Sequence, residues 1–161
     1  MLKPLDESHL EELRQIRSDP EIGKWLISPS VHISARQQER WFKGYLKDET
    51  VKLWVLVEDG AVQGYGQLKH IDLLHLSAEL GVVIAPAYQS QGKGKAITKG
   101  LLEIAQRLGI RRVWLRLFQD NVRALHFYLD CGFAVEGILR DGAFKDGEFK
   151  NLIVMGRLND D

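Results

Sequence analysis

The sequence predicts an α/β fold in which a mixed, mostly antiparallel sheet of about six to seven strands is flanked by about four helices. Two Asp-Gly pairs, at 59–60 and 146–147, each separate two strand-like runs, as in hairpins of antiparallel strands. Apolar residues recur at helical spacing before these runs and between them. The chain has 161 residues, of which 45% are hydrophobic and 27% charged, and is expected to form a single domain, 1–161.

The N-terminal third is expected to be mainly helical. Residues 1–5 form a short apolar start, and Ser8 and Glu11 have the spacing of a capping box for the helix that follows. This helix is expected to end before Pro20, because a proline disfavours helical conformation in the residue that precedes it. Residues 21–26 are expected to add a further turn.

A loop is expected at residues 28–33, which contain Pro29 together with the polar residues Ser30 and His32. Ser34 and Gln37 repeat the capping spacing, so a second helix is expected to begin there. Its apolar residues follow at helical spacing: Trp41, Phe42, Tyr45 and Leu46.

The middle of the chain has the pattern of strands. Residues 51–57 and 61–71 are expected to pair as an antiparallel hairpin. After a loop at 72–77, residues 78–84 are expected to form a third, mostly buried strand that Pro86 ends. The last elements are expected to be a helix at 94–108 followed by Gly109, a strand at 112–118, a short helix at 121–131, and a hairpin of residues 133–139 and 148–158.

Charge and composition exclude several functions. Twenty-two Lys and Arg residues balance twenty-two Asp and Glu residues, so neither nucleic acid nor a membrane is expected as a partner. Cys131 is the only cysteine and the five histidines are scattered, which gives no metal-ligand spacing. No signal-peptide pattern is present, and a cytoplasmic location is expected. The basic run of Arg111, Arg112 and Arg116 is interpreted as a solvated strand edge.

A glycine-rich turn joins the strand at 78–84 to the next helix. Gly92 and Gly94 let the backbone approach an anion closely, and free N–H groups of the first helical turn attract negative charge. Lys93 and Lys95 add positive charge nearby. A phosphate-bearing ligand is therefore expected, with a ligand-free surface turn as the alternative.

Two phosphate-binding motifs are excluded. A Walker A loop fails because Ala87 stands where its first glycine is required and Gly94 where its Ser or Thr is required. A dinucleotide fingerprint fails because Ile97 stands in place of its third glycine.

Two patterns together resemble the GNAT superfamily of N-acetyltransferases. The turn Gln89-x-x-Gly92-x-Gly94 is similar to motif A, which binds the pyrophosphate of acetyl-coenzyme A (acetyl-CoA). Residues 121–133, in the pattern Asn-x-x-Ala-x-x-x-Tyr-x-x-x-Gly-Phe, are similar to motif B. The chain departs from the family at Gln89, where many members have arginine, and at Lys95, where most have an apolar residue. The resemblance covers nearly the whole chain and implies a GNAT-like fold.

The resemblance implies acetyl-CoA as cosubstrate, no metal, and direct attack of a primary amine in a ternary complex. It implies that strand residues 82–84 pair with the pantetheine arm and that a backbone N–H near Val83 or Ile84 polarises the acetyl carbonyl. The coenzyme-binding residues implied in this way are Val82, Val83, Ile84, Gln89, Ser90, Gln91, Gly92, Lys93, Gly94, Lys95 and Asn121.

Tyr128 is the candidate general acid for the departing thiolate. A thiol has a pKa near about 8.5 and a phenol near about 10, so positioning must compensate for an uphill proton transfer. The alternative is a core tyrosine with a satisfied hydroxyl. Asn121 has two compatible roles, as the cap of the short helix and, by resemblance, as a coenzyme contact.

Glu79 is the candidate general base, at a position where relatives in the family often carry a glutamate that accepts the proton of the amine, commonly through water. On a strand it shares a face with Gly81 and Val83, which aims it toward the coenzyme. The alternative is a glutamate paired with a nearby basic residue. His70, His75 and His126 have suitable unperturbed pKa values, but no motif places them.

The acceptor is expected to be a small-molecule or peptide amine. Residues 2–26 and 135–158 resemble the branch that acetylates ribosomal-protein N-termini, spermidine and amino-sugar nucleotides, and the chain ends favour the last. A polyamine site requires clustered carboxylates, whereas Glu39, Asp48 and Glu49 are dispersed. Trp25, Trp41 and Phe42 are candidates for a pocket wall or for the core. A homodimer and a non-catalytic coenzyme A-binding regulatory domain are open alternatives.

Overall fold

The computed structural model describes residues 1–28 and 32–159. Its strands are β1 (Leu2–Pro4), β2 (Lys52–Glu58), β3 (Ala61–Asp72), β4 (Ser77–Ile84), β5 (Arg112–Phe118), β6 (Ala134–Lys145) and β7 (Glu148–Leu158). Its α-helices are α1 (Leu10–Ser18), α2 (Pro20–Gly23), α3 (Ala35–Tyr45), α4 (Lys93–Arg107) and α5 (Val122–Asp130). Short 3-10 helices lie at Glu7–His9 and Pro86–Tyr88. Three residues of the loop expected at 28–33, numbers 29–31, lie outside the described residues.

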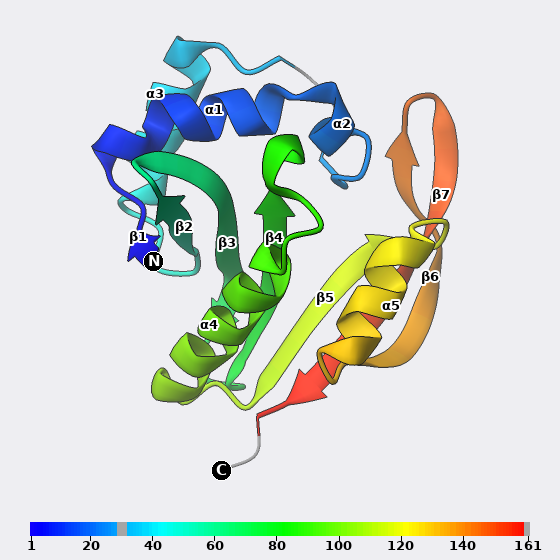
Figure 1. The fold of residues 1–161 in the computed structure, drawn as a ribbon. Helices are drawn as coiled ribbons and strands as arrows, with labels where there is room; N and C mark the ends of the chain where they lie inside the picture. Colours follow the sequence, from blue (N-terminus) through cyan, green and yellow to red (C-terminus); the bar gives the residue numbers. More distant parts are fainter. Residues whose placement is uncertain (29–31, 160–161) are drawn as a thin grey trace.

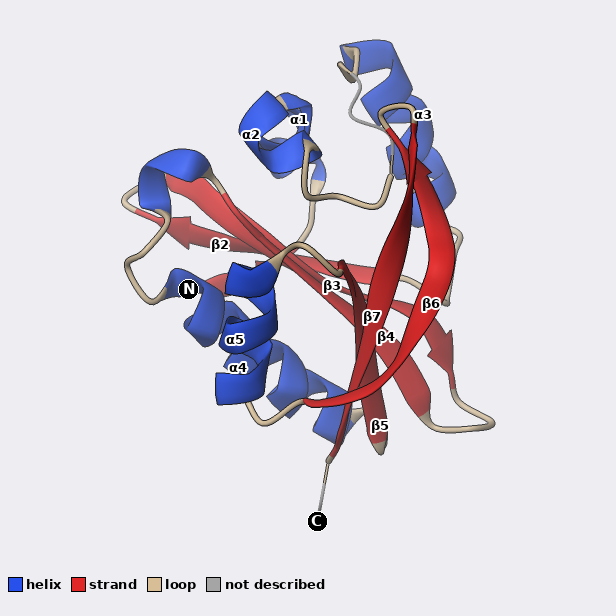
Figure 2. Ribbon diagram, turned by 90° about the vertical axis from the view of Figure 1, so that its right-hand side faces the viewer, coloured by secondary structure: helices blue, strands red, loops and turns tan. Residues whose placement is uncertain are grey.

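The strands form one sheet in the order β1-β2-β3-β4-β5-β7-β6, with helices on both faces (Figures 1 and 2). Within the described residues only β4 and β5 pair in parallel, and the other neighbours are antiparallel. The predicted α/β fold with its mostly antiparallel sheet is therefore confirmed.

Two hydrophobic clusters lie on opposite faces of the sheet. Alternation along each strand sends one set of side chains to each face, for example Leu80 toward α4 and Leu53 toward α1 and α3. The first cluster includes Ile97 and Leu101 of α4 and continues under α5. Figure 2 shows α4 and α5 together on one side of the sheet.

The cap of the first helical segment differs from the expectation. Asp6, not Ser8, is the capping residue: its carboxylate accepts a hydrogen bond from the Ser8 backbone N–H at 2.8 Å, and its own N–H donates to His9. A 3-10 turn therefore precedes α1, and the sequence pattern missed the cap by two residues. The second expected capping box, between Ser34 and Gln37, is confirmed.

The last hairpin is longer than expected. β6 continues to Lys145 instead of ending at Leu139, because the register shifts between Leu139 and Ala143 and pairing with β7 then resumes. The irregular residues 140–142 interrupt the apolar alternation, which is why the sequence pattern ended the strand early.

Lys145 ties this hairpin to the segment that follows α2. Its side chain is buried, and Nζ donates to the backbone carbonyls of Gly23, Leu26 and Ser28 at 2.7, 2.7 and 2.6 Å. One ammonium has three donors, so all of them are used here. Residues more than a hundred positions apart in the sequence are thereby held together.

Replacing Lys145 with Met is expected to lower the free energy of unfolding by about 3 kcal/mol, because three carbonyls lose charge-assisted hydrogen bonds and stay partly buried. Urea unfolding followed by circular dichroism measures this change. Lys99→Met is the matched control, since Lys99 is exposed on α4. Equal unfolding midpoints for the two variants would contradict this role of Lys145.

Candidate active site

A cleft of about 910 Å³ opens where β4 and β5 separate. The two strands pair only where Ser77–Glu79 meets Arg112–Trp114, although they continue to Ile84 and Phe118. Figure 1 shows them diverging beyond that point. The second half of β4 therefore has a partner, β3, on one side only.

The free edge of β4 faces this cleft. The N–H of Ala85 donates to the Gln63 carbonyl at 2.9 Å, which turns this residue toward β3. Because direction alternates along a strand, the N–H of Val83 also points toward β3, and those of Val82 and Ile84 point away from it. Of the two residues expected to polarise the acetyl carbonyl, Ile84 has the suitable direction and Val83 does not.

The glycine-rich turn and the start of α4 form one end of the cleft. Gly92 caps α4 in a left-handed conformation with φ of 77°, and Ser90 has φ of 62°. The N–H groups of the first turn of α4 have no partner within the helix, and together with the helix dipole they suit an anion. Nearly all the expected coenzyme-binding residues line the cleft: Val82, Val83, Ile84, Gln89, Ser90, Gly92, Lys93, Gly94, Lys95 and Asn121.

Gln91 is not among the residues that line the cleft. Its side chain is exposed and its Nε2 donates to the Ala87 carbonyl at 3.5 Å. The side chain of Gln89 also points back toward the protein. Its Nε2 donates to the Ile84 carbonyl at 3.0 Å, and this hydrogen bond stabilises the turn. The side chain of Gln91 therefore supports the loop from outside the cavity.

The cations at this end are arranged differently from the expectation. Lys93 forms an ion pair with Glu58 at 2.7 Å, and the ammonium lowers the pKa of that carboxyl. Arg123 of α5 donates to the Ser90 hydroxyl at 2.8 Å and also lines the cleft. Sequence reasoning missed Arg123, although it lies two residues after Asn121 of motif B.

Tyr128 lies on α5 and lines the same cleft. Its ring makes edge contacts with Phe127 and Phe133, with centroids 4.9 and 5.6 Å apart. Burial raises the pKa of the Tyr128 phenol above its ordinary value, so the hydroxyl stays protonated at neutral pH. Asn121 caps α5, with its Oδ1 accepting from the Ala124 N–H at 3.2 Å, as expected.

Glu79 also lines the cleft but is not free. It is 3% exposed and accepts hydrogen bonds from Arg116 at 3.0 and 3.3 Å. His70 Nδ1 lies 2.8 Å from Oε2, one of the two oxygens that Arg116 contacts, and the ammonium of Lys69 lies 3.8 Å from Oε1. The expected position in the cleft and the alternative of pairing with a basic residue therefore both hold.

The basic run on β5 is not a solvated edge. Arg116 pairs with Glu79, and Arg112 donates to both carboxylate oxygens of Glu136 at 2.8 and 2.6 Å. That expectation was wrong because β5 is an internal strand, between β4 and β7.

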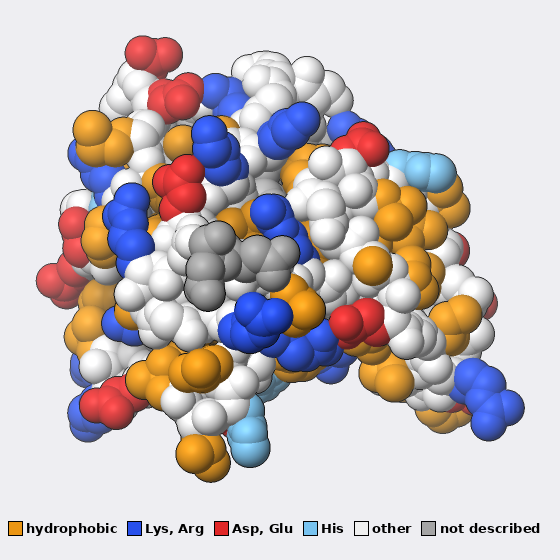
Figure 3. All heavy atoms as spheres, turned by 90° about the horizontal axis from the view of Figure 1, so that it is seen from below, with side chains coloured by type: hydrophobic (Ala, Val, Ile, Leu, Met, Phe, Trp, Pro, Cys, Tyr) orange, Lys and Arg blue, Asp and Glu red, His pale blue; other side chains and the backbone are white. Residues whose placement is uncertain are grey.

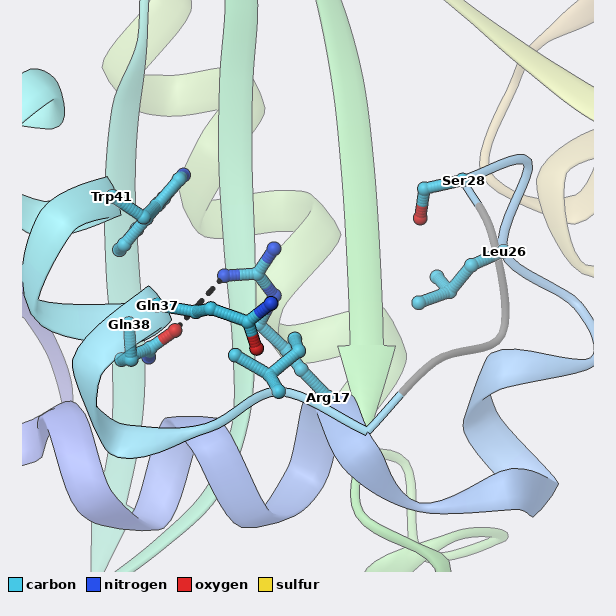
Figure 4. Close-up of a pocket in the computed structure, with 7 residues that line it drawn as sticks. Arg17, Leu26, Ser28, Gln37, Gln38 and Trp41 are labelled. Atoms are coloured by element: carbon cyan, nitrogen blue, oxygen red, sulfur yellow. Dashed lines mark hydrogen bonds between the residues drawn. The ribbon is translucent and has the colours of Figure 1, made fainter.

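The opposite end of the cleft lies between α1, α2 and α3. Trp25 and Trp41 line it, whereas Phe42 is buried in the core. A smaller pocket of about 250 Å³ adjoins it and shares Arg17 and Trp41 with it (Figure 4). Of the three aromatic residues considered for a pocket wall, two have that position.

Metal-binding clusters and membrane-spanning helices are absent from the described residues. None of their His, Cys, Asp and Glu side chains come together in a group of three or more that suits a metal ion. None of their helices is long and apolar enough to cross a membrane.

Known proteins resemble the chain over nearly its full length. The spermidine N(1)-acetyltransferase of Escherichia coli is 25% identical over 155 residues, covering 96% of this chain and 83% of that protein. A provisionally named ribosomal N-acetyltransferase of Bacillus subtilis is 28% identical over 159 residues, covering 95% and 86%. The crystal structure of spermidine N-acetyltransferase from Vibrio cholerae in complex with CoA and spermine shares the fold, with a TM-score of 0.92 at 23% identity, covering 98% and 94%.

The model of the acetyltransferase (GNAT) family matches residues 10–133, which include both the glycine-rich turn and the α5 motif. This match spans most of the chain and confirms the resemblance of the two motifs. The chain belongs to the acetyltransferase (GNAT) family.

Proposed function

We propose that this enzyme transfers the acetyl group of acetyl-CoA to a primary amine by direct attack in a ternary complex. The observation that carries the proposal is a single cleft that is lined by the unpaired edge of β4, the start of α4 and Tyr128. The family match and the CoA complex of the Vibrio cholerae relative support the choice of coenzyme.

The coenzyme is proposed to lie along β4 with its pyrophosphate at the start of α4. The N–H groups of the first helical turn and the guanidinium of Arg123 suit the pyrophosphate. The outward-facing amides of Val82 and Ile84 suit the amides of pantetheine, as an added strand does.

Acetyl transfer then needs three groups from the protein. The amine nitrogen attacks the thioester carbonyl, and the N–H of Ile84 is proposed to stabilise the negative oxygen that forms. As the C–S bond breaks, Tyr128 gives its proton to the coenzyme A thiolate. The nitrogen loses a proton toward Glu79 through water, and the products are the acetamide and the free thiol.

Replacing Gly92 with Val is expected to weaken acetyl-CoA binding by about tenfold or more, because a side chain strains the left-handed backbone that presents the α4 amides. Isothermal titration calorimetry with acetyl-CoA measures this change. Gly109→Val is the matched control, since Gly109 has φ of 78° at the other end of α4. If both variants fold and bind acetyl-CoA with equal affinity, the glycine-rich turn does not bind the coenzyme.

A non-catalytic coenzyme A-binding domain is distinguished by one assay. Such a domain is retained on coenzyme A resin but releases no thiol from acetyl-CoA in the presence of any amine. We expect thiol release that depends on the amine. The names of the relatives make spermidine the first acceptor to test, followed by a peptide N-terminus and an amino-sugar nucleotide.

A homodimer stays a prediction. β6 is an edge strand of the sheet and carries exposed apolar side chains, among them Val135, Ile138 and Leu139. Figure 3 shows hydrophobic side chains gathered on its right-hand side, the side on which α5 and β6 lie. An edge strand of this kind supports association between copies.

A further inference from the structure

The acceptor end of the cleft carries more positive than negative side chains. We use "acceptor end" for the part of the cleft formed by α1, α2 and the sheet face that these helices cover. Its charged residues are Arg17, Glu21, Lys24, Lys69, Glu79 and Arg116. Four cations therefore face two carboxylates.

Both of these carboxylates already have cationic partners. Glu21 pairs with Lys24 at 3.0 Å, and Glu79 pairs with Arg116 at 3.0 Å. An acceptor with several ammonium groups therefore meets no unpaired carboxylate among the described residues that line this end. A polyamine would have to break one of these pairs to gain an ionic contact.

Among the four cations of the acceptor end, Arg17 has no carboxylate partner within the described residues. Its side chain is half-buried, with the guanidinium carbon 4.9 Å from the centre of the Trp41 ring. One nitrogen, Nη1, donates to Gln38 Oε1 at 3.2 Å. A guanidinium has five N–H donors, and the other four have no hydrogen-bond partner among the described residues.

The guanidinium of Arg17 lies in the side pocket between α1 and α3. Figure 4 shows Arg17 between Trp41 and the Gln37 and Gln38 side chains, with Leu26 and Ser28 on the other side of the pocket. The contact with the Trp41 ring attracts the cation to the aromatic face and uses no hydrogen-bond acceptor. The remaining N–H donors of the guanidinium suit the paired oxygens of a carboxylate or a phosphate.

We propose that Arg17 is the anion-binding subsite of the acceptor, and that the acceptor is a primary amine that also carries a phosphate or carboxylate group. This inference rests on the proposed acetyl transfer. The side pocket of about 250 Å³ holds the anionic group beside Trp41, and the amine extends along the cleft toward the thioester. The chain thus differs in acceptor chemistry from the relatives named for spermidine.

The test compares acceptors that differ only in the anionic group. O-phosphoethanolamine is paired with ethanolamine, and γ-aminobutyrate with butylamine, with spermidine as a fifth acceptor. Thiol release from acetyl-CoA gives kcat/KM, corrected for the neutral fraction of each amine. We expect the anionic member of at least one pair to exceed its partner by about 10- to 100-fold, as charge-assisted hydrogen bonds provide. The pair with the larger ratio identifies phosphate or carboxylate.

Variants at position 17 assign this preference to the guanidinium. Arg17→Gln is expected to abolish the preference and leave kcat/KM for ethanolamine and butylamine within about threefold of wild type. Arg17→Lys keeps the charge without the planar edge and is expected to retain part of the preference. Arg107→Gln, an equal change of charge on the exposed end of α4, is the control. Thermal unfolding of each variant confirms that it folds.

Calorimetry supplies a readout that does not depend on turnover. O-phosphoethanolamine or γ-aminobutyrate is expected to bind the CoA-loaded protein, and Arg17→Gln to remove this binding. If spermidine and the neutral amines react as well as the anionic ones, the proposed acetyl transfer is supported and the proposed Arg17 subsite is wrong. If no amine releases thiol and acetyl-CoA does not bind, the proposed function itself fails, and this inference with it.

Discussion

The Tyr128→Phe variant is expected to lose about 10²-fold in kcat while its affinity for acetyl-CoA is unchanged. The substitution removes one hydroxyl and keeps the ring, which packs between Phe127 and Phe133. If that hydroxyl protonates the departing thiolate, its loss falls on the chemical step, and general acids contribute about 10²- to 10⁴-fold. The expected loss is at the lower end because a phenol is a weaker acid than the thiol it protonates.

Three measurements separate this role from packing. Single-turnover kinetics report the chemical step, calorimetry reports coenzyme affinity, and thermal unfolding reports stability. Tyr88→Phe is the matched control, since Tyr88 is another half-buried tyrosine that lines the cleft. Wild-type turnover in Tyr128→Phe would make Tyr128 a core residue.

The pH dependence gives a second test of Tyr128. Burial raises the pKa of its phenol, so the protonated form persists to more alkaline pH than in a free tyrosine. The acid is therefore expected to stay available across the range in which amines become neutral. A decline in kcat well below pH 10 that Tyr128→Phe removes would contradict this expectation.

Most of the fold could be predicted because local signals agree with the tertiary structure. The strand at 112–118 matches β5, and Gly109 ends α4 with a positive φ of 78°. The Asp-Gly turn at 59–60 separates β2 and β3, as expected. The failures occurred where the local pattern is ambiguous, since Asp6 competes with Ser8 for the helix cap.

The candidate site was predictable in its backbone and less so in its side-chain partners. Glycine spacing indicates where a helix begins, and so it predicted the turn at Gly92 and Gly94. Glycine spacing contains no information about ion pairs between residues far apart in the sequence, such as the pair of Glu79 with Arg116. The contact of Arg123 with Ser90 likewise depends on how α5 packs beside the turn.

The Glu79→Gln variant is expected to lose about 10²-fold in turnover at neutral pH and to recover part of the loss as the pH rises. The amine must lose a proton, and at neutral pH most of it is protonated in solution. A carboxylate in the cleft accepts this proton through water, whereas a neutral amide does not. At high pH the bulk solvent supplies neutral amine, so the need for Glu79 diminishes.

The partners of Glu79 make the test sharper. His70 lies 2.8 Å from the carboxylate and its side chain is 61% exposed, which gives an accepted proton a route to solvent. His70→Gln is therefore expected to show a smaller loss with the same recovery at high pH. Arg116→Gln removes the two hydrogen bonds that hold the Glu79 carboxylate in place and is expected to lower turnover.

The outcome decides between two ways of catalysing the reaction. If Glu79 only holds Arg116 in place, Glu79→Gln and Arg116→Gln lower kcat by the same factor at every pH. The enzyme would then select amines that are already neutral and act mainly by placing them against the thioester. If Glu79 is the base, the ratio of wild-type to Glu79→Gln turnover falls as the pH rises toward the pKa of the amine. We expect the second result, because the carboxylate lines the cleft and is linked through His70 to solvent.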